Sequence, residues 1–164
     1  IAVSGTSTVR NWTCLGTAST RTILGESAKK IPGLSSGVLN AEITIPVGSL
    51  DCKNGKMDEH LQKALKMKDH PNIQYVLREY TLNGDSTVQI TGDITIAGHT
   101  ESRVITVTLK PLPDKAVLVT GVMDINMIDF DVDPPKLMLG TLRVGKDVKI
   151  NFSVTVKDTE GETK

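Results

Sequence analysis

Strict alternation of apolar and polar residues is the feature of this sequence that most constrains its fold. Residues 147–157, "DVKINFSVTVK", place every apolar side chain on one face: Val148, Ile150, Phe152, Val154 and Val156. Successive side chains of a β-strand point to opposite faces of its sheet, so this segment is expected to be a strand buried on one face. One-sided burial is typical of antiparallel sheets.

The same pattern recurs in residues 41–47, 87–98, 101–110 and 115–127, and turn-forming residues separate these segments. About eight short strands in this arrangement predict a β-sandwich or an up-and-down barrel. Gly92, in mid-strand, indicates a bend or bulge in its own strand.

Residues 72–82, "NIQYVLREYTL", are ambiguous. Their odd positions place Ile73, Tyr75 and Leu77 on one face, whereas their even positions place Val76, Tyr80 and Leu82 on the other. The alternation therefore assigns no single apolar face to this segment.

One segment, residues 55–73, reads as a helix. Asn54 is a good N-cap residue, and His70 followed by Pro71 is the predicted stop. One helical face is apolar and carries Met57, Leu61, Ala64 and Leu65. We expect this amphipathic helix to cover an apolar surface, namely one open end of a barrel.

Composition disfavours several classes of partner. The chain has 19 Lys and Arg against 19 Asp and Glu, so no net field attracts nucleic acid or an anionic membrane. Aromatic residues make up only 3% of the chain, which is too few for base-stacking platforms. No apolar run is long enough to span a membrane. We expect a single domain over residues 1–164, with neither a transmembrane segment nor a nucleic-acid partner.

Two cysteines, Cys14 and Cys52, are too few for a disulfide framework, and their spacing matches no zinc motif. They form either one bridge or two buried free thiols, and the spacing leaves both alternatives open.

Signals for catalysis or metal binding are weak. The histidines, His60, His70 and His99, lack metal-binding spacing, and the acidic stretch 124–133 lacks the glycine of a calcium loop. The alternating strands place nearly every carboxylate on the outward face. We therefore expect no bound metal, no required cofactor and no enzymatic activity.

Four segments, in order, resemble the YceI-like, polyisoprenoid-binding family. They are "VSGTSTVRNW" (3–12), "IPVGSLDCKNGKMDEHLQKALKMKDHPNIQY" (45–75), "TVQITGDITIAGHT" (87–100) and "GVMDINMIDFDVDPPKLMLGTLRVGKDVKINFSVTV" (121–156). Together they span nearly the whole chain, and their order and spacing are more specific than any one of them.

The resemblance implies an all-β fold: an extended, eight-stranded, antiparallel, lipocalin-like barrel with the helix capping one end. It also implies a non-catalytic protein that binds, transports or sequesters a long amphiphile, such as a polyisoprenoid, an isoprenoid quinone or a fatty-acyl chain. Export to the periplasm or cell surface after removal of a leader, often as a homodimer, belongs to the same expectation.

The resemblance bears on two further positions. The "WTC" and "SLDC" segments resemble one branch of the family, which implies a disulfide between Cys14 and Cys52. Many members have an arginine where this chain has Met127, and a glycine where it has Asp131. Loss of that arginine favours a neutral, quinone-like head group over a pyrophosphate.

The inward faces of the predicted strands and helix give a set of candidate ligand-binding residues. They are Ile43, Ile45, Leu61, Leu65, Tyr75, Ile94, Ile96, Val107, Met123, Ile125, Met127 and Phe152. The alternative is a β-sandwich interaction module, in which the same side chains form a filled core without a ligand.

Overall fold

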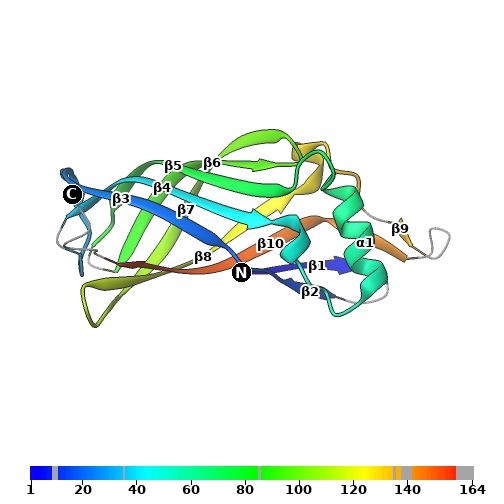
Figure 1. Cartoon of the computed structure of the whole chain (residues 1–164), viewed down its shortest axis with the longest axis horizontal. Coiled ribbons are helices and arrows are strands. Elements are labelled where there is room, and N and C mark those ends of the chain that lie inside the picture. Colours follow the sequence, from blue (N-terminus) through cyan, green and yellow to red (C-terminus); the bar gives the residue numbers. More distant parts are fainter. Residues whose placement is uncertain (9–10, 35, 85, 135, 138–141, 158–164) are drawn as a thin grey trace.

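A single antiparallel sheet, curled on itself, dominates the computed structural model, which describes residues 1–8, 11–34, 36–84, 86–134, 136–137 and 142–157 (Figure 1). Its strands are β1 (Ala2–Ser7), β2 (Trp12–Leu15), β3 (Ser19–Lys30), β4 (Gly37–Pro46), β5 (Asn72–Leu82), β6 (Thr87–Ile96), β7 (His99–Leu112), β8 (Ala116–Asn126), β9 (Lys136–Leu137) and β10 (Leu142–Lys157). The helices are α1 (Gly55–Ala64) and two 3-10 turns, η1 (Val47–Ser49) and η2 (Met127–Phe130).

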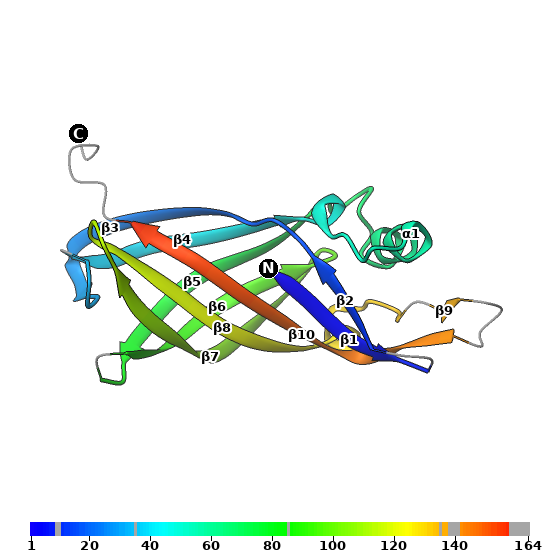
Figure 2. The ribbon, with the colours of Figure 1, turned by 90° about the horizontal axis from the view of Figure 1, so that it is seen from below.

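The strand order is β2-β1-β10-β8-β7-β6-β5-β4-β3, and β9 pairs separately with β10. The curled sheet forms a half-barrel rather than two packed sheets (Figure 2). The all-β, lipocalin-like fold is therefore confirmed. The expected count of eight strands is wrong, because the path contains nine strands within the described part of the chain. Among the described residues, no ladder joins the edge strand β3 to β2 or to β10.

The alternation did not predict strands β1, β2, β3 and β9, and β3 is the longest of these. Most of its residues are exposed, so the segment lacks a sustained apolar face. It is held by pairing with β4 from Ser19 to Lys30, with register shifts between Ile23 and Leu24 and between Gly25 and Lys30. Tertiary pairing, rather than local pattern, determines this strand.

The predicted bulge on the strand of Gly92 is wrong, because the bulge lies on the neighbouring strand, β5. Strand β6 pairs with β7 without interruption, whereas the β5–β6 register shifts between Leu77 and Glu79, opposite Gly92. Gly92 has a different role, because a Cβ at this position would overlap the hydroxyl of Tyr75. The glycine allows the hydroxyl end of the Tyr75 ring to approach β6 closely.

This bulge also explains the ambiguous pattern of β5. A single extra residue reverses which side chains face the interior. Before the bulge, Ile73 and Tyr75 are buried; after it, Tyr80 and Leu82 pack against the interior. Apart from Val76, which packs in neither cluster, the apolar residues of both sets therefore point inward, each set in its own half of the strand.

Helix α1 is shorter than predicted. Asn54 is the N-cap, as expected, and its Oδ1 accepts hydrogen bonds from the backbone N–H groups of Lys56 (3.0 Å) and Met57 (3.2 Å). The helix ends at Ala64, before the predicted stop at His70, because Lys66 adopts a left-handed backbone with φ of 55°.

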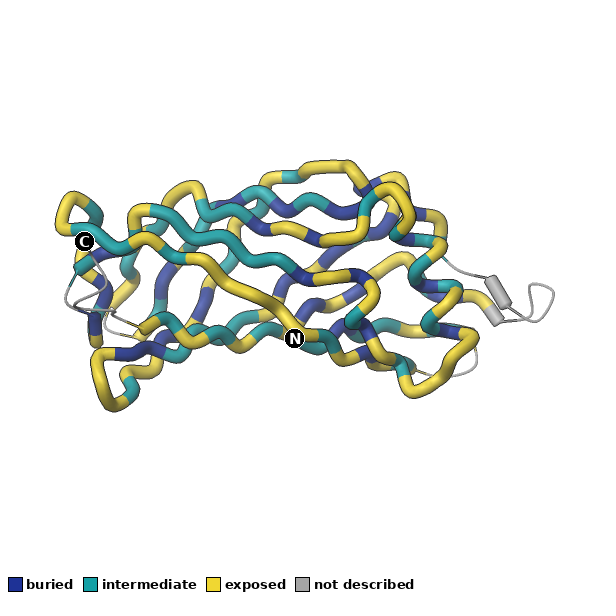
Figure 3. Tube along the Cα trace, viewed as in Figure 1, coloured by how far each residue is buried: buried dark blue, intermediate teal, exposed yellow. Residues whose placement is uncertain are grey.

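The helix covers one end of the curled sheet (Figures 1 and 2). Met57, Leu61 and Leu65 are buried there in a cluster with Leu50 and Phe130. Along the strands, buried and exposed residues alternate, so the apolar faces line the interior (Figure 3). A second buried cluster occupies the opposite end: Ile31, Leu34, Val88, Val107, Leu109 and Val117.

A disulfide between Cys14 and Cys52 joins β2 to the segment that precedes α1. Beside it, the backbones of Leu15 and Asp51 exchange two hydrogen bonds, of 2.9 and 2.7 Å. Strand β2 is one edge of the sheet, and the segment after β4 belongs to the other side. The disulfide therefore connects the two sides of the half-barrel at the helix end.

Replacing both Cys14 and Cys52 with alanine should lower the free energy of unfolding. The bridge closes a loop with a sequence separation of 38 residues, for which chain entropy gives an upper value of about 4 kcal/mol. Equilibrium urea unfolding measures the loss, and a reductant should destabilise the wild type but not the variant. Equal stability of the oxidised wild type and the variant would contradict this role.

Candidate functional site

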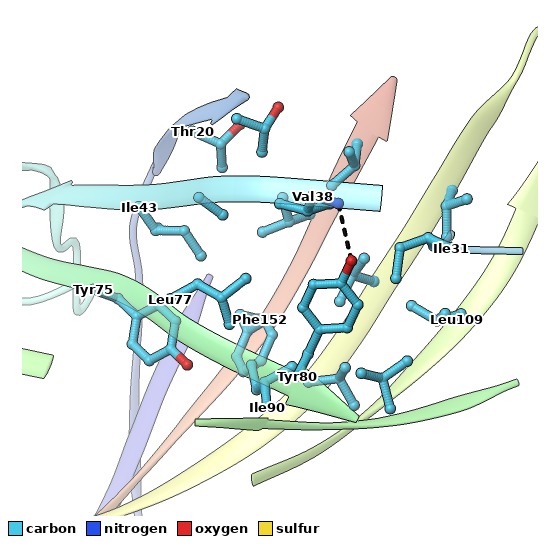
Figure 4. A pocket seen from close by; sticks show the side chains of 18 of the residues that line it. Thr20, Ile31, Val38, Ile43, Tyr75, Leu77, Tyr80, Ile90, Leu109 and Phe152 are labelled. Carbon is cyan, nitrogen blue, oxygen red and sulfur yellow. Dashed lines mark hydrogen bonds between the residues drawn. The ribbon is translucent and has the colours of Figure 1, made fainter. Parts of the chain in front are cut away.

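Three apolar cavities lie in a row inside the curled sheet. The first, which we call the outer cavity, lies at the end away from α1 and has a volume of about 110 Å³ (Figure 4). It is lined by Thr20, Thr22, Ile31, Leu34, Val38, Ala41, Glu42, Ile43, Tyr75, Leu77, Tyr80, Val88, Ile90, Val107, Leu109, Val117, Val119, Phe152, Val154 and Val156.

Two smaller cavities, each of about 50 Å³, continue toward the helix. The middle cavity is lined by Ile1, Ile43, Ile45, Ile73, Tyr75, Ile90, Ile94, Ile105, Met123, Ile150 and Phe152. The helix cavity is lined by Val3, Trp12, Leu50, Leu61, Leu65, Ile73, Ile96, Ile125, Met127, Phe130, Val132, Val148 and Ile150.

Neighbouring cavities share their walls. Ile43, Tyr75, Ile90 and Phe152 border both the outer and the middle cavity, and we call these four residues the waist. Ile73 and Ile150 similarly separate the middle cavity from the helix cavity. Rotamer changes at these few shared positions would bring neighbouring cavities closer to one channel along the sheet.

The structure places all twelve candidate residues from the sequence in these walls. Four border the outer cavity: Ile43, Tyr75, Val107 and Phe152. The middle cavity adds Ile45, Ile94 and Met123, and the helix cavity adds Leu61, Leu65, Ile96, Ile125 and Met127. Their common location follows from the period of two, which directs each strand's apolar side chains to the same interior.

Several wall residues were not among these candidates. Val154 and Val156 lie on the apolar face that the alternation had assigned to the last strand, so that signal could have found them. Ile31 and Leu34 come from the loop between β3 and β4, and they fold inward without any periodic signal. Thr20 and Thr22 belong to β3, a strand that was not predicted.

The side chains that line these cavities carry no positive charge. Among the described residues that line the three cavities, none is Lys, Arg or His, and the only carboxylate is Glu42 at the outer cavity. Moving an isolated anion from water into such an environment is costly. The cavities therefore suit an apolar or uncharged molecule, whereas an anionic head group would have to remain outside them.

Two tyrosines supply hydroxyl groups to the walls, and their environments differ. The Tyr80 hydroxyl donates to the carbonyl oxygen of Lys29 and accepts from the backbone N–H of Val38 at 3.1 Å (Figure 4). It thereby ties β3 and β4 to β5.

Tyr75 is only 9% exposed, and its hydroxyl has no hydrogen-bond partner among the described residues. Burial, reinforced by the negative charge of Asp93, raises the pKa of Tyr75 to about 12. The hydroxyl therefore stays protonated at neutral pH, as a donor within an apolar wall.

The same change, Tyr to Phe, should have opposite effects at the two positions. Tyr75→Phe should raise the free energy of unfolding by about 1–3 kcal/mol, because it removes a buried, unsatisfied hydroxyl. Tyr80→Phe should lower it by about 1 kcal/mol, since two hydrogen bonds are lost. Urea unfolding of the purified protein measures both, and destabilisation by Tyr75→Phe would show that its hydroxyl is satisfied.

A polar groove lies on the outer surface, and its charges are mostly paired. Arg103 contacts Asp129 at 3.1 Å and lies over the Phe130 ring, and Lys149 contacts Asp124 at 2.7 Å. Within the described residues, no group of three or more His, Cys, Asp or Glu side chains is placed to hold a metal ion. None of the described helices is long and apolar enough to cross a membrane.

Residues 5–156 match the model of the YceI-like domain family, which covers most of the chain. No functionally curated protein matches the sequence.

Solved structures share the fold at low sequence identity. BcnA from Burkholderia cenocepacia superposes with a TM-score of 0.73 at 20% identity, over 95% of this chain and 96% of that one. A YceI protein from Campylobacter jejuni gives 0.68 at 18% identity, over 88% and 82%. A polyisoprenoid-binding domain from Saccharophagus degradans, implicated in plant cell wall breakdown, gives 0.69 at 10% identity, over 96% and 94%.

Proposed function

Because the chain belongs to the YceI-like domain family, we propose that it binds a long amphiphilic lipid inside the curled sheet and so transports or sequesters it. The observation that carries this proposal is the row of three apolar cavities along the interior. The lipid class is a polyisoprenoid, an isoprenoid quinone or a fatty-acyl chain. The name of the Saccharophagus degradans domain, as polyisoprenoid-binding, supports this class.

Hydrophobic burial alone can supply the affinity. Each buried methylene contributes about 0.8 kcal/mol, and association costs roughly 4–15 kcal/mol in lost freedom. On the order of ten buried methylenes therefore give useful binding without a strong polar contact. The outer cavity, with a volume of about 110 Å³, is too small to hold such a chain by itself. A long ligand would have to extend through the waist into the middle cavity.

Binding rather than catalysis is the role that we propose. The described cavity walls contain one carboxylate, Glu42, two tyrosine hydroxyls, those of Tyr75 and Tyr80, and the hydroxyls of Thr20 and Thr22. Nucleophilic catalysis needs a nucleophile beside a general base. Glu42 is the one carboxylate of the described walls, and it makes no hydrogen bond to a wall hydroxyl among the described residues. No required cofactor belongs to this proposal.

An extracytoplasmic location, in the periplasm or at the cell surface, is part of the proposal. The disulfide between Cys14 and Cys52 supports it, because such bridges persist mainly in oxidising compartments. The homodimer implied by the family resemblance stays a prediction, and light scattering on the purified protein would test it.

Extraction of the folded protein with organic solvent, followed by mass spectrometry, should yield a lipid with a long apolar chain. Reloading the stripped protein with a fluorescent lipid analogue then gives a dissociation constant. Absence of any co-purifying or reloadable lipid would contradict the proposed function.

Filling the outer cavity should block that reloading. Val119 lines the outer cavity, whereas Val122, on the same strand, is 46% exposed on the outer face. Val119→Trp should weaken binding by more than about tenfold, because excluding even two methylenes costs about 1.6 kcal/mol. Val122→Trp is the matched control and should bind as the wild type does. Equal binding by both folded variants would place the ligand elsewhere.

A further inference from the structure

Among the described residues, the Tyr75 hydroxyl is the one buried side-chain N or O atom without a hydrogen-bond partner. Its side chain belongs to the waist, so it borders the outer and the middle cavity together. The ring lies against β6 over Gly92, which has no side chain to displace it. Figure 4 shows Tyr75 on the same wall as Leu77, within the cavity.

A buried hydroxyl without a partner is costly, and natural structures rarely retain one without a reason. Phenylalanine would fill the same space without that cost. A water molecule is a poor substitute partner, because a buried water needs two to four polar contacts. The other waist residues, Ile43, Ile90 and Phe152, offer none through their side chains.

We propose that the Tyr75 hydroxyl donates a hydrogen bond to an uncharged carbonyl oxygen of the bound lipid, held at the waist between two apolar stretches of the ligand. This inference rests on the proposed lipid-binding function and specifies the chemistry of its ligand. The class comprises long chains with an internal ketone, ester or amide group, and carbonyl-bearing rings with a long tail.

The charges around the waist select an uncharged acceptor. No cationic side chain lines any of the three cavities, so no side chain would compensate the charge of a phosphate or carboxylate buried at the waist. Asp93 lies near enough to affect the titration of Tyr75, and its negative charge would also repel an anion there. Asp93 itself is paired with Arg78 at 2.7 Å, on the outside of the sheet.

The position of the hydroxyl further requires apolar chain on both sides of the acceptor. Toward one end, the outer cavity is lined mainly by Val, Leu and Ile. Toward the other, the middle and helix cavities are lined by apolar side chains as far as Leu61 and Leu65 of α1. Only two side chains that line the middle and helix cavities carry a hydrogen-bond donor, those of Tyr75 and Trp12. The indole of Trp12 already donates to the Thr6 carbonyl oxygen, so Tyr75 is the donor that remains for a carbonyl group of the ligand.

The test is a double-mutant cycle between the protein and the ligand. A symmetric long-chain ketone and the alkane of the same length compete with a fluorescent apolar probe for lipid-stripped wild-type protein and for Tyr75→Phe. The ketone-to-alkane affinity ratio should fall about tenfold in Tyr75→Phe, as expected for the loss of one buried hydrogen bond. Use of the ratio cancels any effect of the substitution on cavity shape or stability.

Tyr80→Phe is the matched control, because it removes a hydroxyl from the same interior that is already bonded to Lys29 and Val38. Its ketone-to-alkane ratio should equal that of the wild type, whatever its absolute affinities. An unchanged ratio in Tyr75→Phe would overturn the inference while leaving lipid binding in place. Failure of both ligands to displace the probe from the wild type would instead reject the proposed function itself, and the inference with it.

Discussion

The one-sided hydrophobicity of the strands is the constraint on which the rest of this structure depends. A sheet with one apolar face must remove that face from water, and a protein commonly does so by packing helices or a second sheet over it. Here the only α-helix among the described residues has 10 residues, which corresponds to a length of about 15 Å. It covers one end and no more. The sheet therefore buries its apolar face by curling around it, and the enclosed interior becomes both the core and the candidate binding site.

Sequence alone predicted much of this arrangement, and its failures have identifiable causes. Alternation located β4, β6, β7, β8 and the second half of β10, and it assigned their inward side chains correctly. Strand β3 was not predicted, because its residues are largely exposed and its pairing with β4 holds it in place. The end of α1 was misplaced because Lys66, rather than a glycine or proline, adopts the left-handed backbone. The two apolar faces of β5 could be reconciled only by a bulge that pairing with β6 reveals.

At the site, the sequence predicted which side chains point into the interior. It did not predict how these side chains pack there. The same inward side chains are compatible with a filled core or with a series of cavities, because packing depends on how far the sheet curls. Nor could the sequence distinguish Tyr75 from Tyr80, since both are tyrosines on one strand, five residues apart. Their difference arises from the backbone groups of Lys29 and Val38, which reach Tyr80 and not Tyr75.

The disulfide gives the half-barrel a fixed end and a free end. Cys14 and Cys52, with the paired backbones of Leu15 and Asp51, restrain the two sides of the sheet next to α1. At the other end, no ladder among the described residues connects β3 to the last residues of β10. Any widening of the gap between these strands therefore pivots about the disulfide. Its amplitude is greatest beside the outer cavity, which both Thr20 of β3 and Val156 of β10 line.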